Sequence, residues 1–323
     1  MIIDIVLREF IQAEHIAIIT HIQPDGDAVG SCLALAEILK EIGKDADLFC
    51  QDRIPASLSF LAGTDQFKSE TAGRMSYDLA IAVDCSDKER MGACAAVFDN
   101  AGNTINIDHH ISNVFFANIN LVDSNAAATG EIIYQLGKAR LGKLSRQTAE
   151  ALYTAISTDT GSFCFSSTTP QSYRIAAELM DCGIDIEHIT NMLYKTNRVE
   201  RMRLLGKALQ SLELYENNQI AVLTITQDDL ISTGAMESET ENIVNYAKDI
   251  VGVKVGILLK ETADGSVKAS FRSNGGVDVG KLAAQFGGGG HRAASGASMQ
   301  MSVPEAKSEL LTAVQTALGE MIQ

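Results

Sequence analysis

The sequence lacks the cysteine pairs that mark zinc knuckles and disulfide frameworks. None of its six cysteines is spaced as C-x-x-C, and they are scattered without a pattern. A zinc knuckle or a disulfide-stapled fold is therefore not indicated. We predict that the cysteines are small core residues of a protein in a reducing compartment. They are Cys32, Cys50, Cys85, Cys94, Cys164 and Cys182.

Long apolar runs are also missing. No run reaches the roughly 18 residues that a membrane span requires. Residues Met1 to Phe10 lack the basic stretch, apolar core and cleavage site of a signal peptide. We therefore expect a cytoplasmic protein without a membrane partner.

Basic residues are scarce relative to acidic ones. The chain has 26 Lys and Arg against 41 Asp and Glu, a formal net charge of −15. Proteins that track long nucleic acids usually carry a basic face that neutralises phosphates. The charge argues against long duplex nucleic acid as a partner, so a nucleotide substrate should be short. Bound cations would offset part of this charge if some of the acids are metal ligands.

The sequence does contain buried strand patterns that end on Asp or His. Such patterns are typical of short strands whose carboxyl ends deliver side chains to a site. Thr104 to Ile107 leads to Asp-His-His at 108–110, Ile16 to Thr20 leads to His21, and residues 77–83 lead to Asp84. A helical pattern from Ser145 to Thr158 ends in the same way on Asp159.

The strand before His21 is followed by a tight turn containing Asp25 and Asp27, and then by a helical pattern from Cys32 to Ile42. Strand, loop and helix in this order begin a doubly wound α/β unit, where ligands bind at the carboxyl ends of the strands. With 323 residues the chain is long enough for two domains. We predict an α/β fold with an N-terminal doubly wound, mostly parallel sheet domain, a helical connector and a smaller α/β domain. Their predicted ranges are 1–185, 186–215 and 216–323.

Each polar residue also has an alternative role. Adjacent histidines can face solvent in a loop, and Asp27 can cap the helix that follows it. Ser86 or Asp87 can cap the next helix without any role for Asp84. Arg90, one turn into that helix, could face the site and hold phosphate or could face solvent. The recurrence of the pattern favours a common site.

Together these side chains suit a divalent metal centre. Imidazoles among hard carboxylates, without cysteine donors nearby, favour Mn²⁺ above Mg²⁺ or Zn²⁺. Six side chains exceed what one catalytic ion uses, whereas two ions about 3.5 to 4 Å apart use them well. Such a pair lowers the pKa of a bridging water, which then attacks phosphorus in line. We expect two Mn²⁺, with Mg²⁺ or Co²⁺ as substitutes. The six candidates are His21, Asp25, Asp27, Asp84, His109 and Asp159.

In order along the chain, these elements resemble the four motifs of the DHH phosphoesterases. The motifs are H-x-x-P-D-x-D at 21–27, V-D at 83–84, D-H-H at 108–110 and D-T-G at 159–161. The resemblance implies a dimanganese centre held by the six candidates, with Asp84 and Asp159 as bridging carboxylates. It also implies that Asp108 orients the histidines and that His110 contacts the scissile phosphate or assists as an acid.

The last third of the chain contains four consecutive glycines followed by a histidine and an arginine. Their backbone amides can approach and cradle an anion, although a flexible linker is an alternative. The segment resembles the G-G-G-H-x-x-A-x-G signature of the DHH-associated C-terminal domain. That resemblance implies that this segment and a preceding strand end bind substrate. The implied residues are Arg272, Ser273, Gly288, Gly289, Gly290, His291 and Arg292.

This layout is similar to the nanoRNase/pAp-phosphatase branch, the bifunctional oligoribonucleases. We therefore expect a manganese-dependent phosphohydrolase that cleaves very short RNAs to mononucleotides, dephosphorylates 3',5'-bisphosphonucleotides, or does both. A cyclic- or linear-dinucleotide phosphodiesterase, an inorganic pyrophosphatase and a non-catalytic nucleotide sensor are the alternatives. The nucleotide substrates present a phosphate and a base to the same groups, so their ranking and the direction of attack stay open. Helical residues 199–214 could offer a homodimer surface.

Overall fold

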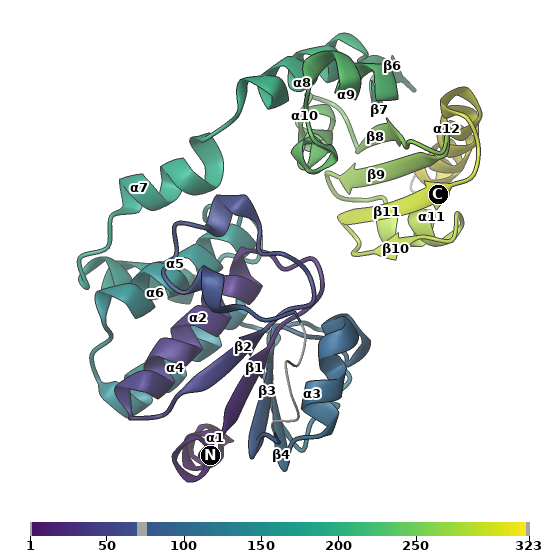
Figure 1. The fold of residues 1–323 in the computed structure, drawn as a ribbon. Helices are drawn as coiled ribbons and strands as arrows, with labels where there is room; N and C mark the ends of the chain where they lie inside the picture. The colour runs from purple at the N-terminus through teal and green to yellow at the C-terminus, as the bar shows by residue number, and fades with distance from the viewer. Residues whose placement is uncertain (1, 70–75, 321–323) are drawn as a thin grey trace. The chain divides into compact units, whose positions relative to one another are not determined.

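The computed structural model describes residues 2–69 and 76–320, and the chain divides into two compact units between Thr196 and Asn197. Figure 1 shows both units, from the purple N-terminal helix to the yellow C-terminal helix. Each has its own sheet and its own hydrophobic core, so the predicted α/β fold class is confirmed. Residue 1 and residues 321–323 of the predicted domains lie outside the described ranges. Within those ranges, no helix has both the length and the apolar character needed to cross a bilayer.

The N-terminal unit is built on five parallel strands. In sheet order they are β2 (Ala46–Phe49), β1 (Ile16–Ile19), β3 (Leu79–Val83), β4 (Asn103–Asp108) and β5 (Ile119–Val122). β1 and β3 pair near the centre and are buried along their whole length. Strands covered on both faces are apolar at every position, which explains their unbroken apolar sequences. β5 lies at one edge of the sheet.

Helices cover both faces of this sheet, as a doubly wound fold requires (Figure 1). The helices of the unit are α1 (Ile2–Gln12), α2 (Gly26–Glu41), α3 (Ala95–Asp99), α4 (Thr129–Leu141), α5 (Arg146–Asp159), α6 (Pro170–Met180) and α7 (Ile186–Thr190). On one face, α2, α4 and α5 share a core with Ile18 and Ile81. On the other face, Phe98 of α3 shares a core with Ile19.

Two glycines let α2 and α5 approach each other closely. A Cβ on Gly26 would lie 2.4 Å from the Thr158 side chain, and a Cβ on Gly30 would lie 2.4 Å from the Ala151 carbonyl oxygen. Both distances are below any real van der Waals contact, so a larger residue would push the helices apart. The close packing brings the N-terminus of α2 beside the C-terminus of α5, where Asp159 ends the helix.

α2 begins at Gly26, six residues before the start of its predicted helical pattern. The Asp25 carboxylate caps it by accepting the N–H of Ala28 at 3.0 Å. The alternative in which Asp27 caps this helix is therefore wrong. Asp27 lies inside the first turn and is buried, which leaves its carboxylate available to the site.

The sequence has helical spacing of apolar residues from Asn125 to Leu136, which predicts a helix there, but α4 begins four residues later, at Thr129. The preceding residues form turns, in which the Asp123 carboxylate accepts the N–H of Asn125 at 3.0 Å. A side chain that satisfies local backbone groups in this way competes with helix formation. The helix N-terminus consequently falls next to the polar edge of the sheet.

The segment predicted as a helical connector, 186–215, spans the division between the units. It contains α7, a π-helical turn (Asn191–Lys195) and α8 (Val199–Gln210), with non-helical residues 196–198 before α8. α8 contributes Leu204, Leu205 and Ala208 to a core of the C-terminal unit.

The six cysteines are all free. Cys32, Cys50, Cys85 and Cys94 are buried, as predicted, whereas Cys182 is half-buried and Cys164 is exposed. The core prediction is wrong for Cys164 because it lies in the turns that follow α5, not in a packed element.

The C-terminal unit is built on a six-stranded mixed sheet. In sheet order the strands are β10 (Gly289–Gly290), β11 (Ala294–Met299), β9 (Val267–Ser273), β8 (Val255–Glu261), β7 (Ile220–Ile225) and β6 (Glu213–Tyr215). β7 and β8 run parallel, and β8 and β9 form an antiparallel hairpin. α11 (Val279–Ala284) and α12 (Val303–Glu320) share a core with one face, and α8, α9 (Gln227–Thr233) and α10 (Val244–Lys248) share a core with the other.

Alternation along β9 gives the two faces of this sheet different chemistry. Val267, Ala269 and Phe271 are buried in the core with α11 and α12. Lys268 and Arg272 point to the opposite face, since successive side chains of a strand alternate between faces. The opposite face therefore carries cationic side chains.

Candidate metal centre

The predicted ligands of the N-terminal unit gather at the carboxyl edge of its sheet. His21 follows β1, Asp84 follows β3, and Asp108 ends β4 directly before His109. Parallel strands place their carboxyl ends at one edge, which is where doubly wound folds bind ligands. Asp25 and Asp27 arrive at this edge from α2, and Asp159 arrives from α5.

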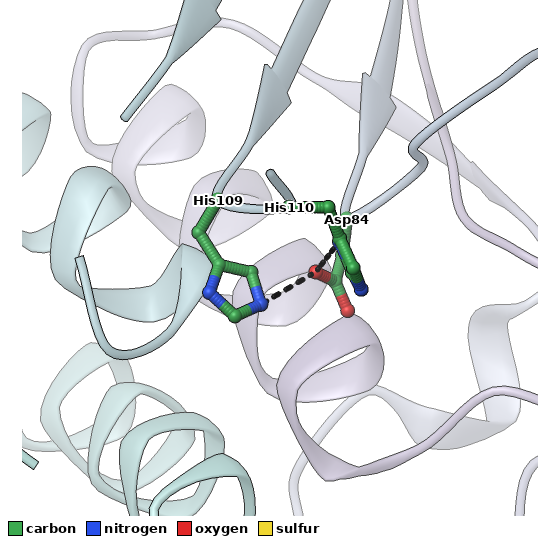
Figure 2. A group of neighbouring side chains, drawn as sticks. All are labelled: Asp84, His109 and His110. Atoms are coloured by element: carbon green, nitrogen blue, oxygen red, sulfur yellow. Dashed lines mark ion pairs between the residues drawn. The ribbon is translucent and has the colours of Figure 1, made fainter. Parts of the chain in front are cut away.

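The Asp84 carboxylate lies between histidines from two different strand ends. Its Oδ2 is 3.6 Å from His21 Nε2, and its Oδ1 is 3.8 Å from His109 Nε2. Figure 2 shows His109 and His110 turned toward Asp84, with His110 Nδ1 at 3.7 Å from Oδ1. Thr129 donates its hydroxyl to the same Oδ1 at 2.8 Å. Asp84 is thus shared by both halves of the site.

The backbone at Asp84 is in a left-handed conformation, with φ of 60°. Non-glycine residues adopt this conformation at a cost of roughly 1 to 2 kcal/mol. The N–H of Asp84 donates to the Ile107 carbonyl at 2.9 Å, so pairing with β4 holds the turn. Backbone strain held by its surroundings is typical of functional positions.

Three groups of side chains bring possible ligand atoms within 4.8 Å of one another. Asp84 belongs to two of them, and His109 also belongs to two. The groups are His21 with Asp25 and Asp84; Asp27 with His109 and Asp159; and Asp84 with His109 and His110. All six predicted ligands therefore lie in one connected cluster.

Asp27 and Asp159 meet His109 from two helices. His109 Nε2 lies 3.3 Å from Asp159 Oδ2 and 3.8 Å from Asp27 Oδ2. Its other nitrogen, Nδ1, donates to the Ala126 carbonyl at 3.3 Å, because a carbonyl can only accept. That hydrogen bond leaves the Nε2 lone pair facing the carboxylates.

The Asp27 carboxylate is held by the N-terminus of α4. It accepts the N–H groups of Thr129 at 2.6 Å and Gly130 at 2.9 Å, and the Ser31 hydroxyl at 2.9 Å. Helix N-termini favour anions because their first N–H groups are free and their dipole is positive. Burial nevertheless raises the pKa of Asp27 well above its usual range, and the charges of Asp84 and Asp159 raise it further.

His21 is oriented in the same manner as His109. Its Nδ1 donates to the Ile22 carbonyl at 2.8 Å, which leaves Nε2 facing Asp84 and also Asp25, at 3.9 Å. Arg90 Nη2 lies 3.2 Å from the same Nδ1. A protonated Nδ1 cannot also accept from a guanidinium, so this approach is a contact and not a second hydrogen bond. Arg90 is exposed, yet its guanidinium reaches His21.

Asp108 orients His110. The Asp108 Oδ1 accepts from His110 Nδ1 at 2.7 Å, and its Oδ2 accepts from the Asn113 amide at 2.6 Å. Burial lowers the pKa of His110, but the Asp108 hydrogen bond and the Asp84 charge outweigh burial and raise the pKa to about 9. The imidazole is therefore cationic near neutral pH.

The donor set and its charge fit a pair of divalent cations. Two imidazole lone pairs and four carboxylates converge, which is a mixed nitrogen and oxygen environment suited to Mn²⁺. Burial raises the pKa of Asp159 to about 6, and the charge of Asp84 adds to this effect while His109 opposes it. Crowded carboxylates of this kind repel one another unless cations lie between them.

The substrate-binding residues predicted from the glycine run lie in the C-terminal unit. Arg272 and Ser273 end β9, and Gly289 and Gly290 form β10, which pairs with β11. Gly290 has φ of 140°, and a Cβ there would lie 2.6 Å from the Ser295 backbone. Two of the four glycines therefore form a short strand that is paired in the sheet, and the flexible-linker alternative is wrong.

Backbone pairing brings these residues to one corner of the unit. The N–H of Ser273 donates to the Ala293 carbonyl at 2.9 Å, and the Arg292 carbonyl accepts from the N–H of Val279 at 3.0 Å. The Ser273 hydroxyl is buried and, among the described residues, has no hydrogen-bond partner. Gly288 is packed against the backbone of β11, and the N–H of His291 donates to the Ala294 carbonyl at 2.7 Å.

Arg272 also lines a pocket of about 490 Å³ within the C-terminal unit. Lys268 and Lys260 line it too, from neighbouring positions on β9 and β8. Its other wall comes from residues 237–244, where Glu237 pairs with Lys260 at 3.3 Å. Burial lowers the pKa of Arg272, so its guanidinium is partly withdrawn from water.

Comparison with known proteins agrees with this geometry. The model for the DHH family, N-terminal domain, matches residues 15–156, and the DHHA1 domain model matches residues 217–320. The bifunctional oligoribonuclease and PAP phosphatase NrnA of Thermus thermophilus is 31% identical, over 94% of this chain and 90% of that protein. The chain belongs to the DHH family.

Two further relatives of this DHH protein are similar over most of their length. The bifunctional oligoribonuclease and PAP phosphatase NrnA of Bacillus subtilis is 32% identical, over 86% of this chain and 87% of that protein. A crystal structure of an exopolyphosphatase-related protein from Bacteroides fragilis has a TM-score of 0.94 and 28% identity, covering 100% and 98% of the two chains. This chain is accordingly a DHH-family phosphoesterase.

Several groups at the site of this DHH protein were missed from the sequence. Thr129 and the N–H of Gly130 contact Asp84 and Asp27, which lie 45 and 103 positions away. Asn113 contacts Asp108 from a loop. A threonine and a glycine at the start of a helix were the available signal, but the predicted helix began too early to place them there.

Proposed function

We propose that this DHH protein is a two-metal phosphoesterase that hydrolyses very short oligoribonucleotides to mononucleotides and removes phosphate from 3',5'-bisphosphonucleotides. The observation that carries the proposal is the shared Asp84, whose two oxygens face His21 and His109. A carboxylate in that position suits two adjacent cations. The names of the relatives at about 30% identity support the substrate classes.

In this proposal the ligands divide into two sets that share Asp84. His21 and Asp25 complete one set, and Asp27, His109 and Asp159 complete the other. A bound pair of divalent ions, Mn²⁺ in our proposal, would acidify a water and neutralise charge on the phosphoryl oxygens. The protein contributes the fixed orientation of both imidazoles, since each Nδ1 is tied to a backbone carbonyl.

His110 is proposed to act on the substrate. Asp108 holds its imidazole at 2.7 Å and raises its pKa through that hydrogen bond. A cation fixed beside the metal ligands can stabilise negative charge on the scissile phosphate or protonate the leaving oxygen. Asp108 is proposed to hold that imidazole in place, with Asn113 holding Asp108 in turn.

The C-terminal unit is proposed to bind the anionic, nucleotide part of the substrate. Among the described residues, the Arg272 guanidinium donates only to the Phe271 carbonyl, at 3.0 Å, so most of its donors are available. A pocket of about 490 Å³ is within the usual range for small-molecule sites. Ser273, the amides of Gly288 to Gly290, His291 and Arg292 are proposed to bind substrate at the corner of this unit where β9 ends. Arg90, which lies beside His21 in the N-terminal unit, is proposed to hold a substrate phosphate there.

The net charge of −15 supports a short substrate. Long nucleic acids bind through many phosphate contacts, which an acidic surface opposes. The three cations that line the pocket of the C-terminal unit, Lys260, Lys268 and Arg272, can serve one or a few phosphates. We therefore propose no long duplex partner.

The test is hydrolysis by the purified full-length chain. RNAs of two to ten nucleotides, pAp, the linear dinucleotide pApA and cyclic di-AMP are compared at equal concentration with Mn²⁺, with Mg²⁺ and with EDTA. We expect Mn²⁺-dependent release of mononucleotides from the shortest RNAs and of phosphate from pAp, and no turnover with EDTA. Equal rates on all RNA lengths would overturn the short-substrate proposal. A much higher rate on a dinucleotide than on pAp would favour the phosphodiesterase alternative.

A further inference from the structure

Glu131 is a buried carboxylate in the first turn of α4. Its residue is 2% exposed, and its Oε2 accepts the N–H of Ala127 at 3.3 Å. Its Oε1 is buried and has no hydrogen-bond partner among the residues that the structure describes. A buried carboxylate with so few partners is costly, so its retention calls for a role.

The peptide group that Glu131 contacts also contacts His109. The N–H of Ala127 and the carbonyl of Ala126 belong to one planar peptide unit and point in opposite directions. Glu131 accepts from the N–H side, and His109 Nδ1 donates to the carbonyl side at 3.3 Å. Hydrogen bonds linked in this way polarise and strengthen one another.

The series of hydrogen bonds from Glu131 through the peptide to His109 ends at the candidate metal centre. Because Nδ1 of His109 donates to the peptide, its Nε2 lone pair faces Asp159 at 3.3 Å and Asp84 at 3.8 Å. Imidazoles that bind metals usually donate their second nitrogen to a carboxylate or a carbonyl, which fixes both tautomer and ring orientation. Here one peptide group separates the Glu131 carboxylate from the His109 imidazole.

We propose that Glu131 is a positioning residue of the metal centre, acting on His109 through the Ala126–Ala127 peptide. Glu131 holds the peptide plane, and the peptide carbonyl holds the imidazole with its lone pair toward the site. The inference rests on the proposed function in so far as His109 is a metal ligand. Glu131 itself is not among the groups whose ligand atoms converge on the cluster.

A purely structural role for Glu131 makes a different prediction. A carboxylate in the first turn of a helix stabilises that helix through the dipole and through free N–H groups. Such a role lowers stability when it is lost but leaves the metal affinity of the folded protein unchanged. Asp229 offers a matched case, because it lies in the first turn of α9 and accepts the N–H of Thr226 at 3.0 Å.

The first experiment is calorimetric titration of Mn²⁺ into the metal-stripped full-length protein. We expect Glu131→Ala to weaken Mn²⁺ binding about 10- to 100-fold, as losses of such supporting groups do. Glu131→Gln should lose less, since its amide oxygen still accepts from Ala127. Asp229→Ala and Asp229→Asn should lower the melting temperature and leave Mn²⁺ affinity unchanged. Mn²⁺ affinity of Glu131→Ala within twofold of the original protein would overturn the inference.

The second experiment measures the tautomer of the His109 imidazole directly. In ¹⁵N-histidine-labelled, metal-free protein, His109 should carry its proton on Nδ1, and Glu131→Ala should shift its two nitrogen resonances toward a tautomer mixture. If Glu131→Ala does not fold, Glu131→Met, which has a similar volume but cannot accept from Ala127, supplies the same readout. An unchanged His109 spectrum in both variants contradicts the inference. Mn²⁺ binding without phosphoester hydrolysis would defeat the proposed function and leave this inference standing.

Discussion

The two units arrange their charged side chains in opposite ways. In the N-terminal unit, Asp27, Asp84 and Asp108 are at most 3% exposed, and each accepts hydrogen bonds from neighbouring groups. In the C-terminal unit, Arg272 is half-buried and Lys268 is exposed, beside a pocket. The proposed ligands for cations are built into a packed framework, whereas the proposed anion-binding groups lie on one face of a sheet.

This difference follows from what each site has to hold. Buried carboxylates repel one another, so backbone and side-chain donors must fix them before a cation arrives. Arginine and lysine side chains keep part of their hydration and can adjust to phosphates in several positions. Substitutions should therefore have large, all-or-none effects in the first unit and graded effects in the second.

The largest effect is expected for Asp84→Asn. The amide has nearly the same shape but loses the charge that faces His21 and His109. We expect phosphoester hydrolysis with Mn²⁺ to fall by about 1000-fold or more, measured as kcat. Asp99→Asn, at a surface carboxylate that is 50% exposed, is the control and should keep full activity. A loss of less than tenfold for Asp84→Asn would mean that the shared carboxylate is dispensable.

Arg272→Ala tests the second unit and should have an intermediate effect. Loss of a charge-assisted hydrogen bond to phosphate costs about 1.5 to 3 kcal/mol, which corresponds to roughly 10- to 150-fold in affinity. We expect KM for pAp to rise by that factor while Mn²⁺ affinity stays unchanged. Arg146→Ala, at an exposed arginine paired with Glu150, is the matched control. Weakened Mn²⁺ binding in Arg272→Ala would contradict the separation of the two roles.

The crowded carboxylates predict that the metal-free protein loses stability as pH rises from about 6.5 to 9. The pKa of His110 is raised to about 9, so its stabilising charge is complete below its ordinary value near 6.5 and disappears as pH passes 9. The pKa of Asp159 is raised to about 6, so its ionisation lowers stability mainly between pH 4 and 6, below this window, and the raised pKa of Asp27 acts in the same direction. We expect a decrease of about 2 kcal/mol, or a few degrees in Tm.

Scanning calorimetry with EDTA and with Mn²⁺ measures this effect. Mn²⁺ should raise Tm more at pH 8.5 than at pH 6.5, because the carboxylates are then fully ionised. His110→Ala should reduce the pH dependence of the metal-free protein. A Tm that rises between pH 6.5 and 9 without metal would contradict the assigned directions of these pKa values.

The smallest effect is expected for Lys268→Ala. The side chain is exposed and, in the described chain, has no recorded ion pair, so its contribution to anion binding is screened by water. We expect KM for a short RNA to rise by about threefold, with the difference reduced at high salt. An effect as large as that of Arg272→Ala would mean that the exposed lysine is as important as the half-buried arginine.

Site residues that directly follow a buried strand could be predicted because their sequence signal is local. The residues after β1, β3 and β4 could be placed because each buried apolar run ends at a polar residue only one or two positions away. Parallel pairing then brings His21, Asp84 and His109 to one edge. Asp159 was harder to place, since its position depends on α5 packing against the glycines of α2.

Most of the site groups that were not predicted from the sequence depend on the residue at which a helix begins. The turn after Asp123 delays α4, and this delay puts the N–H groups of Thr129 and Gly130 against Asp27. Nothing in the local sequence of Asp27 indicates those donors. The pocket beside Arg272 also has no local sequence signal, because residues 237–244 supply one wall and lie far from β9 in the sequence.

The sequence by itself determined the α/β class, the succession of buried strands and the identity of the groups that end them, because burial and backbone preference act over a few neighbouring residues. Only the tertiary structure decided which donors hold Asp27, which peptide links Glu131 to His109, and which histidine nitrogens face each oxygen of Asp84. Those arrangements depend on how closely helices and strands pack, and packing is settled between residues that are distant in the chain.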